Sequence, residues 1–545
     1  MKSKISTKSK IIRRINQNNS KRISRNACSI MVVLIMLALT STSVFAQTSD
    51  IASTVSFKLG NENLMSSYHH LIAGKRVGLI TNQSGVNSQG ESTIDVLAND
   101  STVDLVALYG PEHGIDGQAG AGEYIESYIH KELGIPVYSL YGKTRKPSES
   151  MLADVEVILF DVQDIGARTY TYISTLNYCI KAAKECEKTI IVLDRPNPLG
   201  GVIVDGWVLE DQFETFVGVD NLPTAHGMTV GELALYFNRD IGADVRVVPM
   251  EGYSRETIYQ DTGLPWIATS PNIPDIDSVF GYMSTGLGEG TGIFQADKFK
   301  WIGGKGIDAF AFANLLNQAQ LSGVTFIPEV RGSAGGVRLV INDYRLFNPA
   351  KTGIYALTYA HSLNSFKVPK SGKTTVMFDK IMGTDKIGIY LEQGLTPQEI
   401  DAKNLTRLNS FKEERKKYLI YSDEPYHQLS VIVQGKTVEF DSEPYIDENN
   451  RLMVPLRAIV EALGAQVDWS LEKRTINISG DVLGKKKSIL FVIDEKTAIV
   501  DDARNEMDTC PVIKNSRTMI PARYVSEFMG ATVNWNGETR TVTVE

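Results

Sequence analysis

Residues 155–198, VEVILFDVQDIGARTYTYISTLNYCIKAAKECEKTIIVLDRPNP, hold a complete strand–helix–strand unit. Two apolar runs, at 155–160 and 189–193, have the length of buried strands. The stretch between them, 172–187, repeats its apolar residues at helical spacing. Strands that are apolar throughout are typical of a parallel sheet with helices on both faces. The segment therefore predicts a βαβ unit of a doubly wound sheet.

The same pattern extends toward the N-terminus. Apolar strands are predicted at 76–80, 103–109 and 136–141, and a helical stretch at 92–99 separates the first two. This alternation of strands and helices predicts an α/β fold with a Rossmann-like, doubly wound parallel sheet. In such folds the functional side chains gather at the carboxyl ends of the strands.

Polar side chains follow each of the five predicted strands, so we expect them to line one crevice. Asp, Asn, Gly and Pro also cap helices and make turns, and this alternative accounts for Asn82 and Asn197. It accounts poorly for the adjacent Glu112 and His113. The polar residues at the strand ends are Asn82, Gln83, Glu112, His113, Gln163, Asp164, Arg168, Tyr172, Asp194 and Arg195.

The motifs of common cofactor enzymes are missing from the sequence. No G-x-G-x-x-G follows the first strand, and there is no Walker A motif, no H-E-x-x-H and no G-x-S-x-G. These absences argue against a nucleotide cofactor, a zinc site and a serine esterase. The sequence therefore predicts no cofactor and no bound metal.

The charge of the 545-residue chain is divided unevenly. Residues 1–46 carry nine Lys or Arg and no acidic residue, which leaves 47 basic against 64 acidic residues, a net charge of −17, for the rest. Such an acidic chain is a poor partner for nucleic acid. The apolar run 29–40 and the small residues before Gln47 predict a signal peptide cleaved after Ala46. An uncleaved anchor is the alternative. We expect a secreted, cell-envelope protein.

Carboxylates in a polar cleft lined by aromatic residues suit carbohydrate chemistry. Glycoside cleavage needs an acid that protonates the leaving oxygen and a second group opposite. Glu112 is the best candidate for the acid, although it could instead be a helix N-terminal carboxylate. Its partner is left open among Asp164, Asp116 and Glu123. His226 could line the cleft or simply satisfy loop backbone groups.

Several long motifs resemble the exo-β-N-acetylmuramidase family, long catalogued as a domain of unknown function, over residues 55–422. They are VGLITNQSGV (77–86), LYGPEHGIDGQAGAGE (108–123), PVYSLYG (136–142), FDVQDIGARTYTYISTL (160–176), VLDRPNPLGG (192–201), HGMTVGELALYFN (226–238) and SPNIP (270–274). The resemblance implies release of N-acetylmuramic acid from the non-reducing end of peptidoglycan fragments. It also implies an active site between a Rossmann-like and a smaller auxiliary domain.

The resemblance implies that the G-P-E-H-G motif carries the catalytic glutamate, which here is Glu112. With it we group His113 and Asp164 as catalytic candidates. The expected substrates are muropeptides or disaccharides derived from peptidoglycan. The candidate substrate-binding residues are Asn82, Gln83, Gln163, Arg168, Tyr172, Asp194, Arg195, His226 and Asn272.

Residues 281–295 depart from the family pattern, because they keep a Gly-Glu-Gly fragment but lack the expected arginine. The glycine-rich part, 286–292, is expected to be a flexible loop. The departure leaves open an altered sugar specificity. It also leaves open a peptidoglycan-binding protein without turnover, or a largely structural envelope protein.

The C-terminus contains a repeat. Residues 452–478 align with 518–544 at a constant offset of 66. Each unit reads as a turn, a helix closed by glycine and two strands, and resembles the copper amine oxidase N-terminal-like stalk domain. Residues 428–545 contain no histidine, so we expect a spacer or wall-attachment module without copper. The matched Trp469 and Trp535 favour core packing over sugar stacking.

The sequence thus predicts a signal peptide (1–46), a Rossmann-like catalytic domain (55–324), an auxiliary α+β domain (325–422) and a two-repeat α+β stalk domain (428–545). In the auxiliary domain we expect a strand at 336–342 and a helix at 353–362, among others.

Overall fold

The structure is a computed structural model of the chain. It describes residues 57–423, 430–440, 442, 444–447, 451–470, 473–482, 485–514, 517–536 and 541–545. The predicted signal peptide lies outside these residues. Within them, no helix combines the length and the apolar character that a membrane crossing requires.

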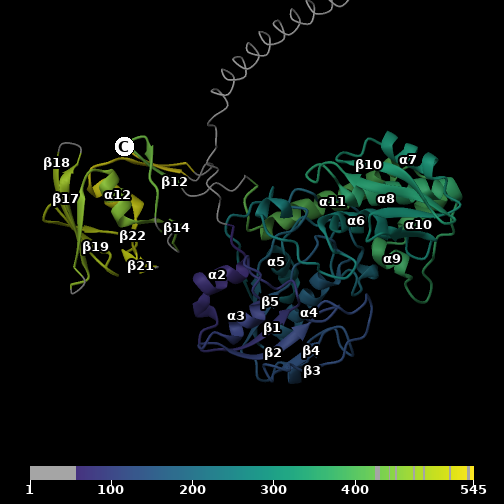
Figure 1. Cartoon of the computed structure of the whole chain (residues 1–545), viewed down its shortest axis with the longest axis horizontal. Helices are drawn as coiled ribbons and strands as arrows, with labels where there is room; N and C mark the ends of the chain where they lie inside the picture. The colour runs from purple at the N-terminus through teal and green to yellow at the C-terminus, as the bar shows by residue number, and fades with distance from the viewer. Residues whose placement is uncertain are drawn as a thin grey trace, which may run out of the picture. The chain divides into compact units, whose positions relative to one another are not determined.

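A seven-stranded sheet of order β3-β4-β2-β1-β5-β6-β7 forms the first part (Figure 1). Six strands run parallel, and the short edge strand β3 is antiparallel to β4. The parallel, doubly wound prediction is confirmed, while β3 and β7 were not predicted. The strands are β1 (Arg76–Thr81), β2 (Asp104–Gly110), β3 (Tyr128–Ile129), β4 (Pro136–Ser139), β5 (Val157–Asp161), β6 (Thr189–Leu193) and β7 (Asp244–Val248).

The central strand β5 shows why the strands are apolar throughout. Ile158 and Phe160 belong to the hydrophobic core on one face of the sheet, and Leu159 belongs to the core on the other face. Because side chains alternate along a strand, both faces are covered only if every residue is apolar. The chain order reverses between β1 and β5, and ligands bind at such a switch point in open α/β sheets.

Helices cover both faces of this sheet. The helices α2 (Gly60–Ser66) and α3 (Thr93–Ala98) supply Leu64 and Leu97 to one core, and α4 (Thr171–Glu185) and α5 (Val230–Ile241) pack in the other. The start of α5 has the capping box that its sequence predicts. Its Thr229 hydroxyl accepts from the Glu232 amide at 3.2 Å, and the Glu232 carboxylate accepts from the Thr229 amide at 3.0 Å.

The second part contains a four-stranded antiparallel sheet of order β10-β11-β9-β8. The predicted domain boundary at 324/325 falls after the first residue of β10, so residues from both sides of it share this sheet. The predicted helix 353–362 lies within α8, which starts earlier because Asn348 caps it and Pro349 occupies its first turn. The strands are β8 (Ile293–Ala296), β9 (Trp301–Lys305), β10 (Val324–Arg331) and β11 (Ala334–Ile341). The helices are α6 (Ile276–Thr285), α7 (Ala309–Gln318), α8 (Pro349–Asn364), α9 (Met377–Met382), α10 (Lys386–Glu392) and α11 (Pro397–Arg415).

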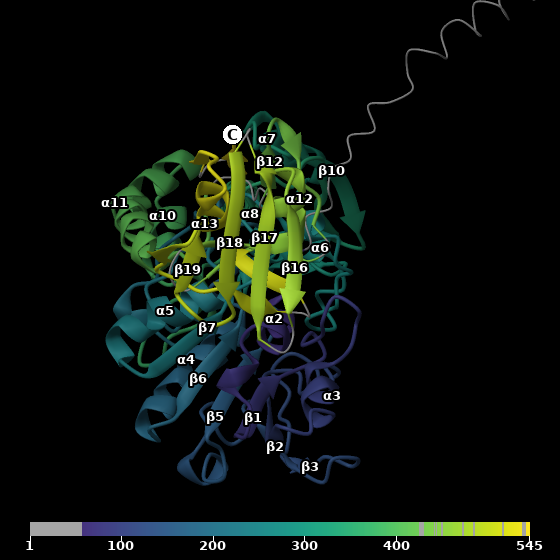
Figure 2. The same ribbon diagram turned by 90° about the vertical axis from the view of Figure 1, so that its left-hand side faces the viewer.

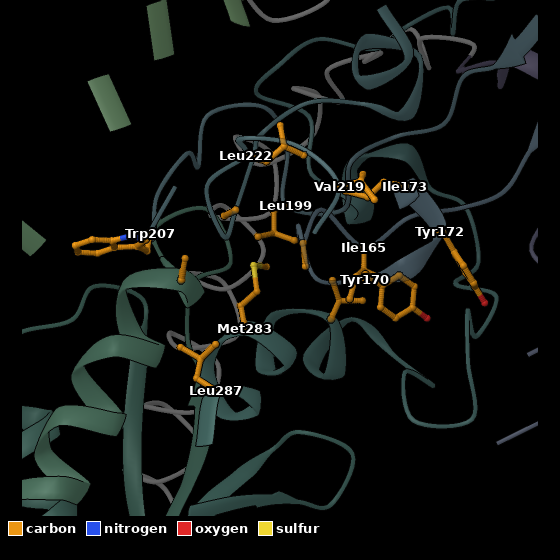
Figure 3. Close-up of a cluster of buried hydrophobic side chains, with 14 of the residues drawn as sticks. Ile165, Tyr170, Tyr172, Ile173, Leu199, Trp207, Val219, Leu222, Met283 and Leu287 are labelled. Carbon is orange, nitrogen blue, oxygen red and sulfur yellow. The ribbon is translucent and has the colours of Figure 1, made fainter. Parts of the chain in front are cut away.

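One hydrophobic core joins the sheet to the helices that follow it. Figure 3 shows Ile165 and Leu199, from the segments after β5 and β6, in one cluster with Met283 of α6 and Leu287. Residues 286–288 form a 3-10 turn in which Leu287 is buried, and the Thr291 hydroxyl donates to the Gly288 carbonyl at 2.5 Å. The expected flexible loop is therefore wrong for this part of the segment.

The C-terminal repeat folds as two equivalent helix–hairpin units. Each helix, α12 (Leu456–Ala462) or α13 (Ala522–Phe528), is followed by a glycine with positive φ, 84° at Gly464 and 92° at Gly530. In Figure 2, β16, β17 and β18 run side by side within a five-stranded sheet. The described strands are β12 (Ser430–Val433), β13 (Lys436–Thr437), β14 (Tyr445–Ile446), β15 (Leu452–Pro455), β16 (Gln466–Ser470), β17 (Thr475–Val482), β18 (Lys485–Val492), β19 (Thr497–Val500), β20 (Ala503–Glu506), β21 (Val512–Lys514), β22 (Arg517–Pro521), β23 (Val533–Asn536) and β24 (Thr541–Val544).

The core-packing prediction for the two repeat tryptophans is wrong. Trp469 is 40% exposed and Trp535 is 45% exposed. Trp469 lies opposite the buried Ile476, and Trp535 lies opposite the buried Val542, so both rings start on the core side. Both lie on edge strands of their sheets, β16 and β23, where no further strand of the described ranges covers them.

Candidate active site

Glu112 follows β2 in a tight turn and is buried. Its Oε1 accepts from the Gly122 amide at 2.8 Å, and its Oε2 accepts from the Thr171 hydroxyl at 2.5 Å. Gly122 belongs to the long connection between β2 and β4, and Thr171 is the first residue of α4. The carboxyl group is therefore held in one orientation by two segments that are distant in sequence.

His113 occupies a strained backbone position beside this glutamate. Its φ is 73°, a left-handed conformation that costs a non-glycine residue energy and is concentrated at functional sites. Its Nδ1 lies 2.7 Å from the Ala119 carbonyl, which can only accept, so Nδ1 carries the proton. The neutral ring then keeps the Nε2 lone pair free. Both segments after β2, residues 111–114 and 119–122, are thereby fixed around Glu112.

Three tyrosine hydroxyls lie within electrostatic range of Glu112. Burial raises the pKa of Tyr141 and of Tyr172, and the neighbouring Glu112 carboxylate adds to both shifts. Burial raises the pKa of Tyr282 to about 12, with smaller contributions from Glu112 and Asp164. Tyr172 also donates to the Thr269 carbonyl, so it ties α4 to the segment before α6. The hydroxyl of Tyr282 lies close enough to both carboxylates to feel their charge.

Asp164 faces His226. The Asp164 Oδ2 accepts from the Gly166 amide at 2.7 Å and lies 3.7 Å from the His226 Nε2. The Met228 amide donates to the His226 Nδ1 at 3.2 Å, so the neutral ring carries its proton on Nε2, toward Asp164. Among the described residues, Asp164 Oδ1 and His226 Nε2 make no hydrogen bond. The pair is buried and leaves acceptor capacity for another group.

The amide side chains predicted to bind substrate make bonds that shape the switch point. Asn82 accepts from the Ser84 amide at 3.0 Å, and its own Nδ2 has no partner in the described chain. Gln83 donates to the Ala268 carbonyl at 2.7 Å. Gln163 donates to the Asp164 and Pro196 carbonyls, each at 2.8 Å.

The two charged residues after β6 pair within the protein. The Arg195 Nε donates to Asp161 at 2.5 Å, and both side chains are buried. Asp194 accepts from the Gly231 amide at 2.7 Å and from the Tyr421 hydroxyl at 2.7 Å. Burial raises the pKa of Asp194 to about 7. Arg195 therefore connects the end of β6 to the end of β5, and Asp194 connects the end of β6 to α5 and to the segment after α11.

Arg168 is fully buried, and its two terminal nitrogens donate to the backbone, while its Nε has no hydrogen-bond partner among the described residues. Its Nη1 donates to the carbonyls of Trp207 and Leu222 at 2.7 and 3.1 Å, and its Nη2 donates to that of Ile381 at 2.6 Å. Burial lowers its pKa to about 10. The arrangement is that of a clamp joining three segments. Asn272, by contrast, is exposed and accepts from Lys298 at 3.2 Å.

A pocket of about 320 Å³ lies against His113. Asp116 and Glu123, the other possible partners of Glu112, line it, and the Glu123 Oε2 accepts from the Gly120 amide at 2.7 Å. Its remaining lining residues are Gly110, His113, Gly114, Ile115, Gln118, Ala119, Tyr124, Ile125, Glu126, Tyr128, Val137, Tyr138 and Ser139.

Sequence reasoning missed three residues near the site, Thr171, Arg145 and Phe216. Thr171 lies inside a quoted motif but looks like an ordinary helix start. The other two lie in connections outside the strand ends. Within the described ranges, no group of three or more His, Cys, Asp or Glu could hold a metal ion.

Comparisons with known proteins agree with this architecture. The family models for the N-terminal and C-terminal parts of the exo-beta-N-acetylmuramidase NamZ match residues 77–277 and 280–421. The copper amine oxidase N-terminal domain matches residues 432–544. This last part has no histidine, and its described residues form no metal-ligating group, so it does not fit a copper site.

A curated relative and two solved structures are similar over the same region. The peptidoglycan beta-N-acetylmuramidase NamZ of Bacillus subtilis is 41% identical over 379 residues, covering 66% of this chain and 91% of the relative. A crystal structure of a DUF1343 family protein from Bacteroides fragilis is 35% identical with a TM-score of 0.61, covering 68% of this chain and 100% of that one. A second DUF1343 structure from that organism is 28% identical with a TM-score of 0.53, covering 68% of this chain and 99% of its own.

Proposed function

The chain belongs to the exo-β-N-acetylmuramidase NamZ family and is a glycosidase, and from this we propose that it hydrolyses peptidoglycan fragments. It releases N-acetylmuramic acid from their non-reducing ends, with Glu112 as general acid. The observation that carries the proposal is the buried Glu112 carboxyl, fixed by Gly122 and Thr171, with a second buried carboxylate, Asp164, that acts on the same Tyr282 hydroxyl.

The chemistry follows from these groups. Glu112 donates its proton to the glycosidic oxygen as the bond from that oxygen to the muramic acid C1 breaks. Water supplies the hydroxyl that C1 gains, and its remaining proton returns to Glu112. Asp164 stabilises the positive charge that develops at the sugar ring, and the Gly166 amide holds the Asp164 carboxylate in place.

We include in this proposal that the protein is exported to the cell envelope. The basic, then apolar, residues 1–46 support export, which would bring the enzyme to its polymeric substrate. The C-terminal domain acts as a spacer or wall attachment. Its two exposed tryptophans are available for contacts outside the chain.

The test uses residues 47–545 with a chromogenic β-N-acetylmuraminide, the matching glucosaminide and a muramic acid–glucosamine disaccharide. We expect release from the muraminide alone. Glu112→Gln should lower kcat by about 10²–10⁴-fold on the disaccharide. The loss should be smaller on the chromogenic substrate, because its leaving group needs little protonation.

Asp164→Asn is the companion variant, and it should be slow on both muraminide substrates. A folded wild-type protein that binds N-acetylmuramic acid but releases none would select the binding-protein alternative. Equal losses of Glu112→Gln on both substrates would remove Glu112 from the acid role.

A further inference from the structure

Arg145 lies against two aromatic rings, those of Tyr141 and Phe216. Its guanidinium carbon lies 3.4 Å from the centroid of the Tyr141 ring and 4.8 Å from that of Phe216. The two ring centroids are 5.9 Å apart. Such a cation–π contact is electrostatic and does not require the N–H groups of the guanidinium, which can still donate hydrogen bonds.

The arginine has no anionic partner in the protein. In the part of the chain that the structure describes, no carboxylate lies within 4.0 Å of it, and its buried Nη1 donates to no protein atom. By contrast, the buried Arg195 and Arg255 have carboxylate partners, Asp161 at 2.5 Å and Glu232 at 3.1 Å. The Nε atoms of Arg168 and Arg415, like Nη1 of Arg145, have no hydrogen-bond partner among the described residues. A buried donor without a hydrogen-bond acceptor costs free energy of folding. An acceptor from outside the chain would complete this group.

Tyr141 connects Arg145 to the site. Burial is the main cause that raises the pKa of the Tyr141 hydroxyl, Glu112 raises it further, and Arg145 counteracts both. The hydroxyl therefore lies near both charged side chains. The Tyr141 ring contacts Arg145 and its hydroxyl lies within electrostatic range of Glu112, so Arg145 belongs to the surroundings of a sugar bound at Glu112.

We propose that Arg145 binds the lactyl carboxylate of N-acetylmuramic acid and so selects this sugar over N-acetylglucosamine. The inference rests on the proposed function and names the residue that recognises its substrate. The two sugars differ only in the lactyl ether at C3, whose free carboxylate is planar and matches the fork of a guanidinium. A lactyl group converted to an amide or ester carries no charge and loses this partner.

The test compares a chromogenic β-N-acetylmuraminide with its lactyl methyl ester. Arg145→Met should lower kcat/KM on the free acid by about 10–100-fold, as expected for a charge-assisted hydrogen bond, and change the ester by less than about threefold. Arg145→Lys keeps the charge without the fork and should fall between wild type and Arg145→Met. Lys143→Met removes a nearby exposed charge and is the matched control, expected to leave both substrates unchanged.

A parallel binding measurement makes the inference independent of turnover. Calorimetric titration with N-acetylmuramic acid and with its methyl ester should show a preference for the acid in wild type and none in Arg145→Met. Equal losses on acid and ester, or an unchanged preference, would overturn the role of Arg145. Wild-type protein that prefers the acid in binding but releases no product would instead count against the proposed function and leave this inference supported.

Discussion

The Thr171 hydroxyl donates to Oε2 of Glu112 at 2.5 Å and so joins the first residue of α4 to the turn after β2. The two residues lie 59 positions apart in the chain. The Gly122 amide holds the other carboxyl oxygen. A general acid must point its proton at one substrate oxygen, and these two donors set the direction.

Replacing Thr171 tests this positioning. Thr171→Val keeps the shape but removes the donor, so we expect kcat on the muraminide to fall by about 10-fold with KM nearly unchanged. Thr171→Ser retains the hydroxyl and should recover most of the rate. Steady-state kinetics of both variants decide it; a rate that stays near wild type in Thr171→Val and falls in Thr171→Ser would mean that the methyl group, and not the hydroxyl, matters.

Arg168 offers a prediction about stability rather than binding. Its guanidinium spans carbonyls of three separate segments, and a shorter ammonium cannot reach all of them. Arg168→Lys should lower the free energy of unfolding by about 3 kcal/mol, measured by urea denaturation. KM of the remaining folded enzyme should stay near the wild-type value. A raised KM with unchanged stability would return Arg168 to the substrate-binding set.

The central strands of the sheet were predictable because each is a short run of apolar residues. An apolar run such as VILF, followed by a helical stretch and a second apolar run, favours a strand covered on both faces, and β5 has this position. The strand β7 was not predicted because Asp244 and Arg246 interrupt its apolar run. An edge strand tolerates such charged residues. Residues at strand ends were likewise placed correctly in the fold, since β2 and β5 bring Glu112 and Asp164 to the same edge.

The division of labour among these polar residues was not predictable. Arg168 and Arg195 look alike in sequence, yet one holds three carbonyls and the other a carboxylate. Which partner each finds depends on segments far away in the chain. Thr171 and Arg145 depend in the same way on contacts made through folding. The prediction that the repeat tryptophans are buried was wrong for another reason. A repeat in the sequence does not reveal which strand lies at the edge of a sheet.

Because Trp469 is partly exposed, we expect its replacement by alanine to lower the free energy of unfolding only slightly. Its cross-strand neighbour Ile476 is fully buried. Trp469→Ala should cost about 1 kcal/mol, less than the 2–5 kcal/mol expected for Ile476→Ala, although the tryptophan side chain is larger. Urea unfolding of both variants gives the comparison. A larger cost at Trp469 would restore the core-packing interpretation.

Asp194 makes the unfolding free energy depend on pH. Burial raises its folded-state pKa to about 7, well above the value of about 4 in an unfolded chain. The folded protein therefore keeps a proton that the unfolded chain has already lost. Its contribution to stability is fully present below about pH 4 and is lost as the pH rises through 7.

The close packing around Asp194 explains this burial. A Cβ on Gly231 would lie 2.7 Å from the Asp194 Cγ, so only glycine lets the α5 amide approach the carboxyl group. Asp194→Asn cannot ionise. The free energy of unfolding of the wild type should therefore fall, relative to that of this variant, by about 1.4 kcal/mol per pH unit between pH 5 and 7. Urea unfolding at several pH values measures it, with the exposed Asp104→Asn as control. Parallel pH profiles for wild type and Asp194→Asn would mean that Asp194 stays ionised in the fold, stabilised by the Gly231 amide and the Tyr421 hydroxyl.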